Sequence, residues 1–269
     1  MYIYFIIASL FILGICVGSF LNVLIYRLED KKRKNLGGRS FCPHCEKQID
    51  WHDNIPVVSW LLLQGKCRSC KKYISVQYPL VELSTGLVFA VLIVIPSGAI
   101  AESRNPLELM NLLFWLFFAS SLIAIFVYDL KHQIIPDEII YTVLVFGLVY
   151  VGINTLLGGN LPYLTDHLLS GLIAGGFFYS LAAVSNGKWM GGGDIKLVAF
   201  MGLILGWQGV LIALYVAFIL GAIVGVFALL SGEKKLGSKI PFGPFLVIGT
   251  FVGLTYGEKI ISFYVKIFM

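Results

Sequence analysis

The chain has 269 residues, of which 58% are hydrophobic and only 13% are charged, whereas an ordinary soluble domain carries about 25% charged residues. Together with a mean hydropathy of +0.87, this composition excludes a soluble enzyme, a disordered chain and a secreted disulfide scaffold. It indicates a polytopic membrane protein. The net charge of +5 is modest, and the positions of the charges are more informative than their sum.

Apolar runs that approach the length of about 20 residues needed to cross a bilayer recur along the whole chain. We predict an all-α polytopic membrane protein with about eight transmembrane helices, at 4–26, 80–96, 107–128, 138–157, 166–185, 195–206, 209–230 and 243–264. The sixth run is short, so we expect a tilted or partly re-entrant helix there. The first run lacks the basic start of a signal peptide and is expected to be retained. These runs divide the chain into a first helix (1–26), a polar insertion (27–79) and a seven-helix membrane domain (80–269).

The distribution of Lys and Arg predicts the orientation in the membrane. With eight spans, all but three of the 20 Lys and Arg residues fall on one side, the exceptions being Arg104, Lys259 and Lys266. The polar insertion is therefore expected in the cytoplasm, with both termini outside. The basic run 31–34 is interpreted as a positive-inside anchor, and a lipid-headgroup or acidic-partner site is the alternative.

Four of the five cysteines form two C-x-x-C pairs in the polar insertion, Cys42 with Cys45 and Cys67 with Cys70. Two such pairs can complete a tetrahedral S4 site, which suits Zn(II) and leaves no open position for water, so the metal would be structural. An insertion with few large apolar side chains also needs the folding energy that a metal supplies. A redox dithiol pair and bystander thiols remain alternatives, and His44 is a possible alternative ligand. The fifth cysteine, Cys16, is expected to be a small packing residue.

Two carboxylates fall at the predicted cytoplasmic edge of the membrane, where charges are usually functional. Asp129 ends the third span, and Asp194 opens the sixth after three glycines. Two carboxylates at one depth can share a proton, so that one activates water and the other polarises a carbonyl. The alternatives are a helix N-cap for Asp194 and an interfacial cap or a Lys131 partner for Asp129. Asp137 is a rival to Asp129, although an N-cap role is expected for it.

A series of motifs runs in order through residues 18–245. They are GSFLNV (18–23), YRL (26–28), CPxC (42–45), NIPVVSW (54–60), GKCRxC (65–70), YPLVE (78–82), Asp129 with IPD (135–137), MGGGDIKL (190–197) and IPFGPF (240–245). Together they closely resemble the type IV prepilin peptidases, also called leader peptidase/N-methyltransferases. The run MGGGDIKL is similar to the G-x-G-D signature of intramembrane aspartyl proteases.

The resemblance implies an enzyme of the cytoplasmic membrane with its active site at the cytoplasmic side. Such an enzyme removes the short basic leader from type IV prepilins or pseudopilins, with Asp129 and Asp194 as the catalytic pair. Many members also methylate the new N-terminal amine with S-adenosylmethionine. The resemblance points to the insertion and residues 78–86 for the methyl-donor site, whose residues are unknown. The partners expected are the pilin substrate and the lipid bilayer, and no nucleic acid.

Acidic side chains are better suited than the basic insertion to meet a basic leader, and Glu82, Asp137 and Glu138 are candidates. Two departures from the family pattern, Glu29 for a proline and Gln77 for a basic residue, concern methylation and leave the aspartates unaffected. A peptidase without methyltransferase activity is therefore one alternative. A proton or ion transporter with the two aspartates as a relay, and a membrane-anchored zinc module that recruits partners, are alternatives from other functional classes.

Overall fold

The computed structural model describes residues 2–29, 39–94, 106–158, 160–232 and 240–268, and within these ranges every extended regular element is a helix. Two isolated antiparallel bridges in the polar insertion are the exceptions to helix among the described residues. The chain divides into two compact units, Met1–Ala124 and Ile125–Met269, and each is described by itself. The predicted all-α membrane fold is confirmed.

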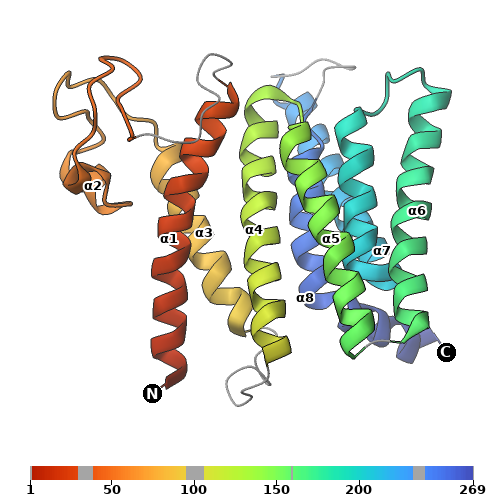
Figure 1. The fold of residues 1–269 in the computed structure, drawn as a ribbon. Helices are drawn as coiled ribbons and strands as arrows, with labels where there is room; N and C mark the ends of the chain where they lie inside the picture. The colour runs from red at the N-terminus through yellow and green to blue at the C-terminus, as the bar shows by residue number, and fades with distance from the viewer. Residues whose placement is uncertain (1, 30–38, 95–105, 159, 233–239, 269) are drawn as a thin grey trace. The chain divides into compact units, whose positions relative to one another are not determined.

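The first unit combines two packed helices, α1 (Tyr2–Glu29) and α3 (Gln77–Val94), with the polar insertion between them (Figure 1). The insertion contains the short helices η1 (Trp51–Asn54) and α2 (Val58–Leu62). The helices α1 and α3 approach closely because Gly14 and Gly18 have no side chain at their contact. A Cβ atom on either glycine would lie 2.7 Å from the α3 backbone. Small residues on one face are a common way for membrane helices to pack.

The second unit contains the end of α4 and the helices α5 to α8. The helix bounds are α4 (Pro106–His132), α5 (Asp137–Leu157), α6 (Leu161–Val184), α7 (Gly192–Leu230) and α8 (Gly243–Phe268). α7 is the central element, since α5, α6 and α8 all pack against it. Its side chains Phe200 and Met201 are fully buried, as are Phe178 of α6 and Leu246 of α8.

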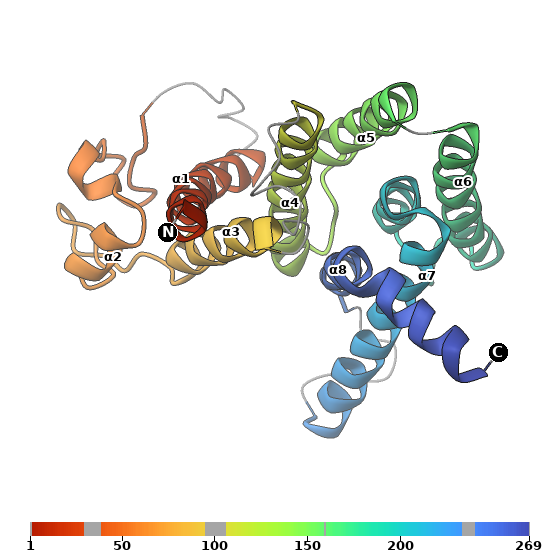
Figure 2. The ribbon, with the colours of Figure 1, turned by 90° about the horizontal axis from the view of Figure 1, so that it is seen from below.

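α7 is interrupted at Gly206, whose φ of 66° and ψ of −174° are not helical. Before the break, Ala199 faces Gly175 of α6, and beyond the break Phe218 lies against Phe178 of the same helix, with 6.0 Å between ring centroids. The two parts of α7 therefore reach the same level of α6, so the chain turns back at the break, and Figure 2 shows the change in direction. The predicted short sixth span and the following span are these two parts.

Two adjacent side chains of α6 bind the backbone at this break. In an uninterrupted helix the Trp207 amide would donate to the Leu203 carbonyl. Here the Nδ1 atom of His167 lies 2.8 Å from the Leu203 carbonyl oxygen, and the Trp207 amide donates to the Asp166 carboxylate at 3.4 Å. The polar groups released by the break thus have partners on α6.

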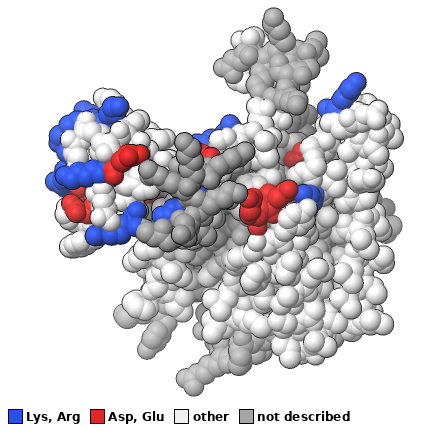
Figure 3. Space-filling view, turned by 45° about the horizontal axis from the view of Figure 1, so that its top comes forward, with Lys and Arg blue, Asp and Glu red and all other residues white. Residues whose placement is uncertain are grey.

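Five of the described helices are long and apolar enough to cross a membrane, namely Tyr4–Glu29, Leu109–His132, Asp137–Leu157, Leu161–Val184 and Gly192–Leu230. Two further helices, Gln77–Leu92 and Gly243–Gly257, are also apolar but shorter. The flanks of the helices in Figure 3 carry almost no charged side chains, as a lipid-facing surface requires. The count of eight spans stays a prediction.

Two local expectations were wrong. The helix α4 continues to His132, so Asp129 lies within its last turn, whereas the third span was expected to end at Asp129. Helix-forming residues continue to this point, and Gln133, with a φ of 54°, and Pro136 follow it. Cys16 is exposed on α1, so it is not a packing residue within the described part of its unit.

Candidate functional site

The two C-x-x-C pairs fold into two matching knuckles. In each knuckle the first cysteine carbonyl accepts a 2.9 Å hydrogen bond from the amide of the residue after the second cysteine, Glu46 in one and Lys71 in the other. These two residues have positive φ values of 56° and 59°, and an isolated β-bridge closes each knuckle. The repeated geometry aims both pairs of sulfur atoms at one point.

The four sulfur atoms of Cys42, Cys45, Cys67 and Cys70 all lie within 4.8 Å of one another, and the Cys42 and Cys70 Sγ atoms are 3.8 Å apart. Zn–S bonds of about 2.3 Å in a tetrahedron place sulfur atoms about 3.8 Å apart. The donor set and its spacing therefore fit a Zn(II) ion. His44 is exposed, as expected for a residue that is not a ligand.

Two of these thiols have different electrostatic surroundings. Burial raises the pKa of Cys42 to about 11, whereas the backbone amide of Cys70 lowers the pKa of Cys67 to about 7. The thiolate is the form that binds metal, so a lower thiol pKa favours metal binding. Beside the knuckles, Arg68 forms two 2.7 Å hydrogen bonds with Asp53, which lowers the pKa of that carboxyl group. This pair ties the η1 segment to the second knuckle.

The first candidate catalytic carboxylate, Asp129, is buried in the last turn of α4, with 4% of its surface exposed. Its Oδ2 atom accepts a 3.0 Å hydrogen bond from the amide of Gly243, the first residue of α8. A Cβ atom at position 243 would lie 2.6 Å from the same oxygen, so the carboxylate fits only against a glycine. A helix N-terminus with a free amide is a favourable partner for a carboxylate.

The second candidate carboxylate, Asp194, lies in the first turn of α7. Its Oδ2 atom accepts a 3.3 Å hydrogen bond from the Gly191 amide, which precedes the helix. α7 begins at Gly192, so Asp194 sits inside the first turn and is not the N-cap residue. Asp129 and Asp194 both belong to the second unit.

Gly193 lets the start of α7 approach the segment between α4 and α5. A Cβ atom there would lie 2.8 Å from the Cβ atom of Ile135, which is buried. Gly193 therefore has a packing role next to Asp194. This contact brings the start of α7, which carries Asp194, against the segment that follows Asp129. The sequence pattern did not indicate that Ile135 makes it.

Asp137 is engaged elsewhere. It is the first residue of α5, after Pro136 at the N-cap position, and its carboxylate pairs with Lys196 at 2.5 Å. The same ammonium group lies 4.5 Å from the centre of the Tyr141 ring. The expected N-cap role was wrong by one position. Asp137 is also largely exposed, unlike Asp129, and Glu138 beside it is exposed.

Glu82, another acidic candidate, is buried between α1 and α3, with 6% of its surface exposed. Its Oε2 atom accepts a 2.7 Å hydrogen bond from the amide of Val57 in the polar insertion. In the described conformation it is not open to an incoming leader. The sequence did not indicate this connection between the insertion and α3.

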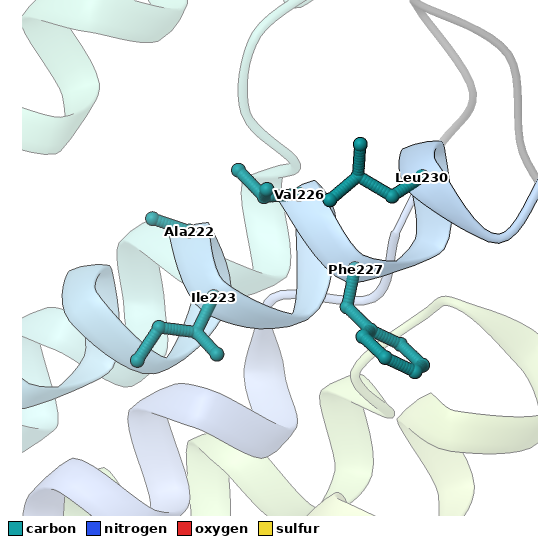
Figure 4. Close-up of a pocket in the computed structure, with 5 residues that line it drawn as sticks. All are labelled: Ala222, Ile223, Val226, Phe227 and Leu230. Atoms are coloured by element: carbon teal, nitrogen blue, oxygen red, sulfur yellow. The ribbon is translucent and has the colours of Figure 1, made fainter.

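A shallow hollow on the second part of α7 has no polar side chain. Figure 4 shows its five lining residues, which are Ala222, Ile223, Val226, Phe227 and Leu230. A surface of this kind suits lipid or an apolar helix and offers no group for acid–base or nucleophilic chemistry. The aspartates are therefore the stronger candidates for catalysis.

Two family models match the chain. The model described as the bacterial peptidase A24 N-terminal domain matches residues 12–95, and the model of the type IV leader peptidase family matches residues 116–226. The first covers α1 from residue 12 onward, the knuckles and α3, and the second covers both aspartates.

Several curated proteins named prepilin leader peptidase/N-methyltransferase are similar over nearly their whole length. The protein from Stutzerimonas stutzeri is 36% identical, and the one from Pseudomonas aeruginosa is 35% identical, each alignment covering 95% of this chain and 92% of the relative. The protein from Bacillus subtilis is 33% identical, over 97% of this chain and 98% of the relative. No solved structure matches this chain.

Proposed function

We propose that this chain, which belongs to the type IV leader peptidase family, cleaves the basic leader from type IV prepilins or pseudopilins and methylates the new N-terminal amine. The single observation that carries the peptidase function is the buried Asp129 carboxylate, held by the Gly243 amide in the same compact unit as Asp194. Similarity to relatives named prepilin leader peptidase/N-methyltransferase supports both activities.

The two aspartates can perform the cleavage as a pair that shares one proton. Two neighbouring carboxylates resist carrying two negative charges, so one stays protonated while the other is ionised. The ionised group removes a proton from water, which attacks the scissile carbonyl carbon, and the protonated group donates its proton to the carbonyl oxygen. Proton return to the leaving amine then releases the leader. The hydrogen bond from the Gly243 amide orients the Asp129 carboxylate throughout the reaction.

The knuckles serve a structural role in this proposal. Cys42, Cys45, Cys67 and Cys70 hold one zinc ion, which supplies folding energy to the insertion. Four thiolate ligands leave no position for a water molecule, so the zinc takes no part in peptide hydrolysis.

We place the active site at the cytoplasmic side of a multi-pass inner-membrane protein, with both termini outside. The Lys and Arg distribution over the predicted spans supports this orientation. The site then lies where a basic leader, still on the cytoplasmic side of the membrane, can reach the aspartates.

Methylation is assigned to the first unit. S-adenosylmethionine supplies an electrophilic methyl group when bound, and transfer requires a free amine but no aspartate pair. A soluble methyl donor needs a site open to the cytoplasm, and the insertion is the polar part of this unit. The acceptor amine appears only after cleavage, so the two reactions follow each other in a fixed order.

The test is the mass of the product formed from a purified prepilin by the purified protein, with and without S-adenosylmethionine. We expect a leaderless pilin without the cofactor and the same product heavier by one methyl group with it. Asp194→Asn should lose cleavage yet methylate a pre-cleaved pilin, whereas Cys67→Ser should impair methylation at least as much as cleavage. Intact prepilin as the only species would refute the peptidase function, and cleavage without methylation would leave a peptidase only.

A further inference from the structure

A cluster of polar side chains, Ser19 and Asn22 of α1 and Glu82 of α3, lies between two apolar helices in the first unit. Asn22 and Glu82 are 3% and 6% exposed. Ser19 follows Gly18, whose backbone packs against Glu82, and the Asn22 Nδ2 atom donates a 3.0 Å hydrogen bond to the Tyr78 carbonyl, one helical turn before Glu82. Ser19 and Asn22 are themselves one turn apart on α1, so the three side chains form one group.

The cluster has more acceptors than donors. The Oδ1 atom of Asn22 is buried and has no hydrogen-bond partner in the part of the chain that the structure describes, which is costly for a polar atom. The Glu82 carboxylate is acceptor-only when ionised, and it accepts a hydrogen bond from the Val57 amide. A group with several polar hydrogens would satisfy this set better than the protein does alone.

The Val57 amide reaches Glu82 from a strained backbone. Val57 has a φ of 61° and a ψ of −52°, a conformation that is a clear outlier for a β-branched residue. Such strain persists only where surrounding contacts enforce it, and it is concentrated at functional sites. The 2.7 Å hydrogen bond to Glu82 is one contact that enforces it here. Displacement of that amide would release the strain.

We propose that Ser19, Asn22 and Glu82 form a binding site for a cationic amine, in which the Val57 amide occupies the position that a ligand ammonium group takes. An ammonium group offers three hydrogens and carries the charge that a buried carboxylate needs, and a hydrogen-bond donor is what the Asn22 oxygen lacks. The negative charge of Glu82 would repel an anion, and an apolar group would leave the Asn22 oxygen without a hydrogen bond. The insertion segment around Val57 then opens when the amine binds.

This inference rests on the proposed methyl transfer, which brings two amines to the first unit. One is the new N-terminal amine of the cleaved pilin, and the other is the amino group of the methyl donor. Both present the same chemistry to Glu82, and direct binding measurements separate them.

The experiment uses the full-length, zinc-loaded protein in detergent and a peptide with the sequence of a leaderless pilin N-terminus. The peptide is tested with a free and with an acetylated N-terminus, because acetylation removes the charge and leaves the rest unchanged. We expect wild-type protein to bind the free peptide at least tenfold more tightly. Glu82→Gln should abolish that preference, while its affinity for the acetylated peptide stays at the wild-type level.

Two further variants protect the result against a simple folding defect. Thr85→Val is the matched control, since Thr85 is equally buried on α3 but donates its hydroxyl to the Val81 carbonyl of its own helix. It should keep the full preference. Ser19→Ala removes one half-buried hydroxyl from the cluster and should reduce the preference severalfold without loss of zinc.

Affinity for S-adenosylmethionine, measured on the same variants, identifies the source of the amine. Loss of peptide preference with unchanged affinity for the methyl donor assigns the site to the pilin amine. The opposite result assigns it to the methyl donor. If Glu82→Gln changes neither binding reaction while Thr85→Val behaves as wild type, the cluster is a structural tie and the inference is wrong. Product masses from the same preparations report separately on the proposed function.

Discussion

The zinc knuckles and the aspartate site differ in how the chain brings their residues together. Each knuckle is formed by one short continuous stretch, residues 40–49 and 65–74, and the backbone hydrogen bonds that close it stay within that stretch. The aspartate site draws Asp129 from the end of α4, Asp194 from the start of α7 and the Gly243 amide from the start of α8. Spacing alone therefore determines the first, whereas the second exists only when several helices have packed.

This difference has consequences for the effect of substitutions. A local site with its own metal can lose its structure without disturbing distant helices, because its stability comes from the ligands themselves. A site assembled from three helix ends depends on close backbone contacts, so small changes of shape at one end alter the geometry of the others. The predictions below separate these two behaviours.

The largest effect on activity is expected at the aspartates. Asp129→Asn and Asp194→Asn should each reduce cleavage at least about a thousandfold, because neither remaining carboxylate can act as both acid and base. The double variant should be little worse than either single variant, since residues that act as one unit are not additive. Initial rates of leader removal in detergent measure this. Substantial cleavage by one single variant would contradict the pairing.

The knuckles should break independently of the membrane helices. Cys42→Ser should release zinc and make the insertion sensitive to protease, because three ligands hold the metal much less tightly than four. The helix content of the membrane domain should be unchanged. Metal analysis with limited proteolysis and circular dichroism measures the two parts. Wild-type protein that contains no zinc while its cysteines are reduced would refute the site.

Gly243→Ala tests the dependence of the aspartate site on a close backbone contact. The new methyl group would lie 2.6 Å from the Asp129 carboxylate and must displace it, and a displacement of about 1 Å can cost about a hundredfold in rate. Gly176→Ala in α6 is the control, since a methyl group there meets nothing within 4 Å. Equal cleavage rates for the two variants would show that the Gly243 contact does not position Asp129.

The smallest effect is expected at Asp137. Its ion pair with Lys196 is 2.5 Å long but exposed, with 62% and 30% of the two side chains accessible. Exposed pairs contribute about 0–1 kcal/mol, so Asp137→Asn should keep cleavage within a few fold of wild type. The same rate assay applies. Inactivity equal to that of Asp129→Asn would mean that the carboxylates of this segment were assigned the wrong way round.

The sequence was sufficient for features that follow from local spacing or from hydrophobic length. The two C-x-x-C pairs predicted a four-sulfur cluster, and the apolar runs predicted the helices to within a few residues. The expectation that both aspartates lie near one membrane edge depends on the number of spans between them and stays a prediction.

Contacts between distant helices could not be read from the same pattern. The IPFGPF run was one of the motifs that resemble the family, but nothing in it showed that the Gly243 amide binds Asp129. The pairing of Asp137 with Lys196 and of Glu82 with Val57 also joins segments far apart in sequence. Such pairs depend on the register and rotation of packed helices, which hydrophobic length leaves undetermined.

The interruption of α7 bears on how the protein is assembled during synthesis. The stretch from Gly192 to Leu205 is only about 20 Å long at about 1.5 Å per residue, against a hydrocarbon layer of about 30 Å. In a membrane, the backbone polar groups that such a break releases need protein partners. Asp166 and His167 of α6 provide these partners, and α6 precedes α7 in the chain. The groups that bind the broken backbone are therefore already synthesised when the first part of α7 emerges, and we expect the two helices to enter the bilayer as a joined pair.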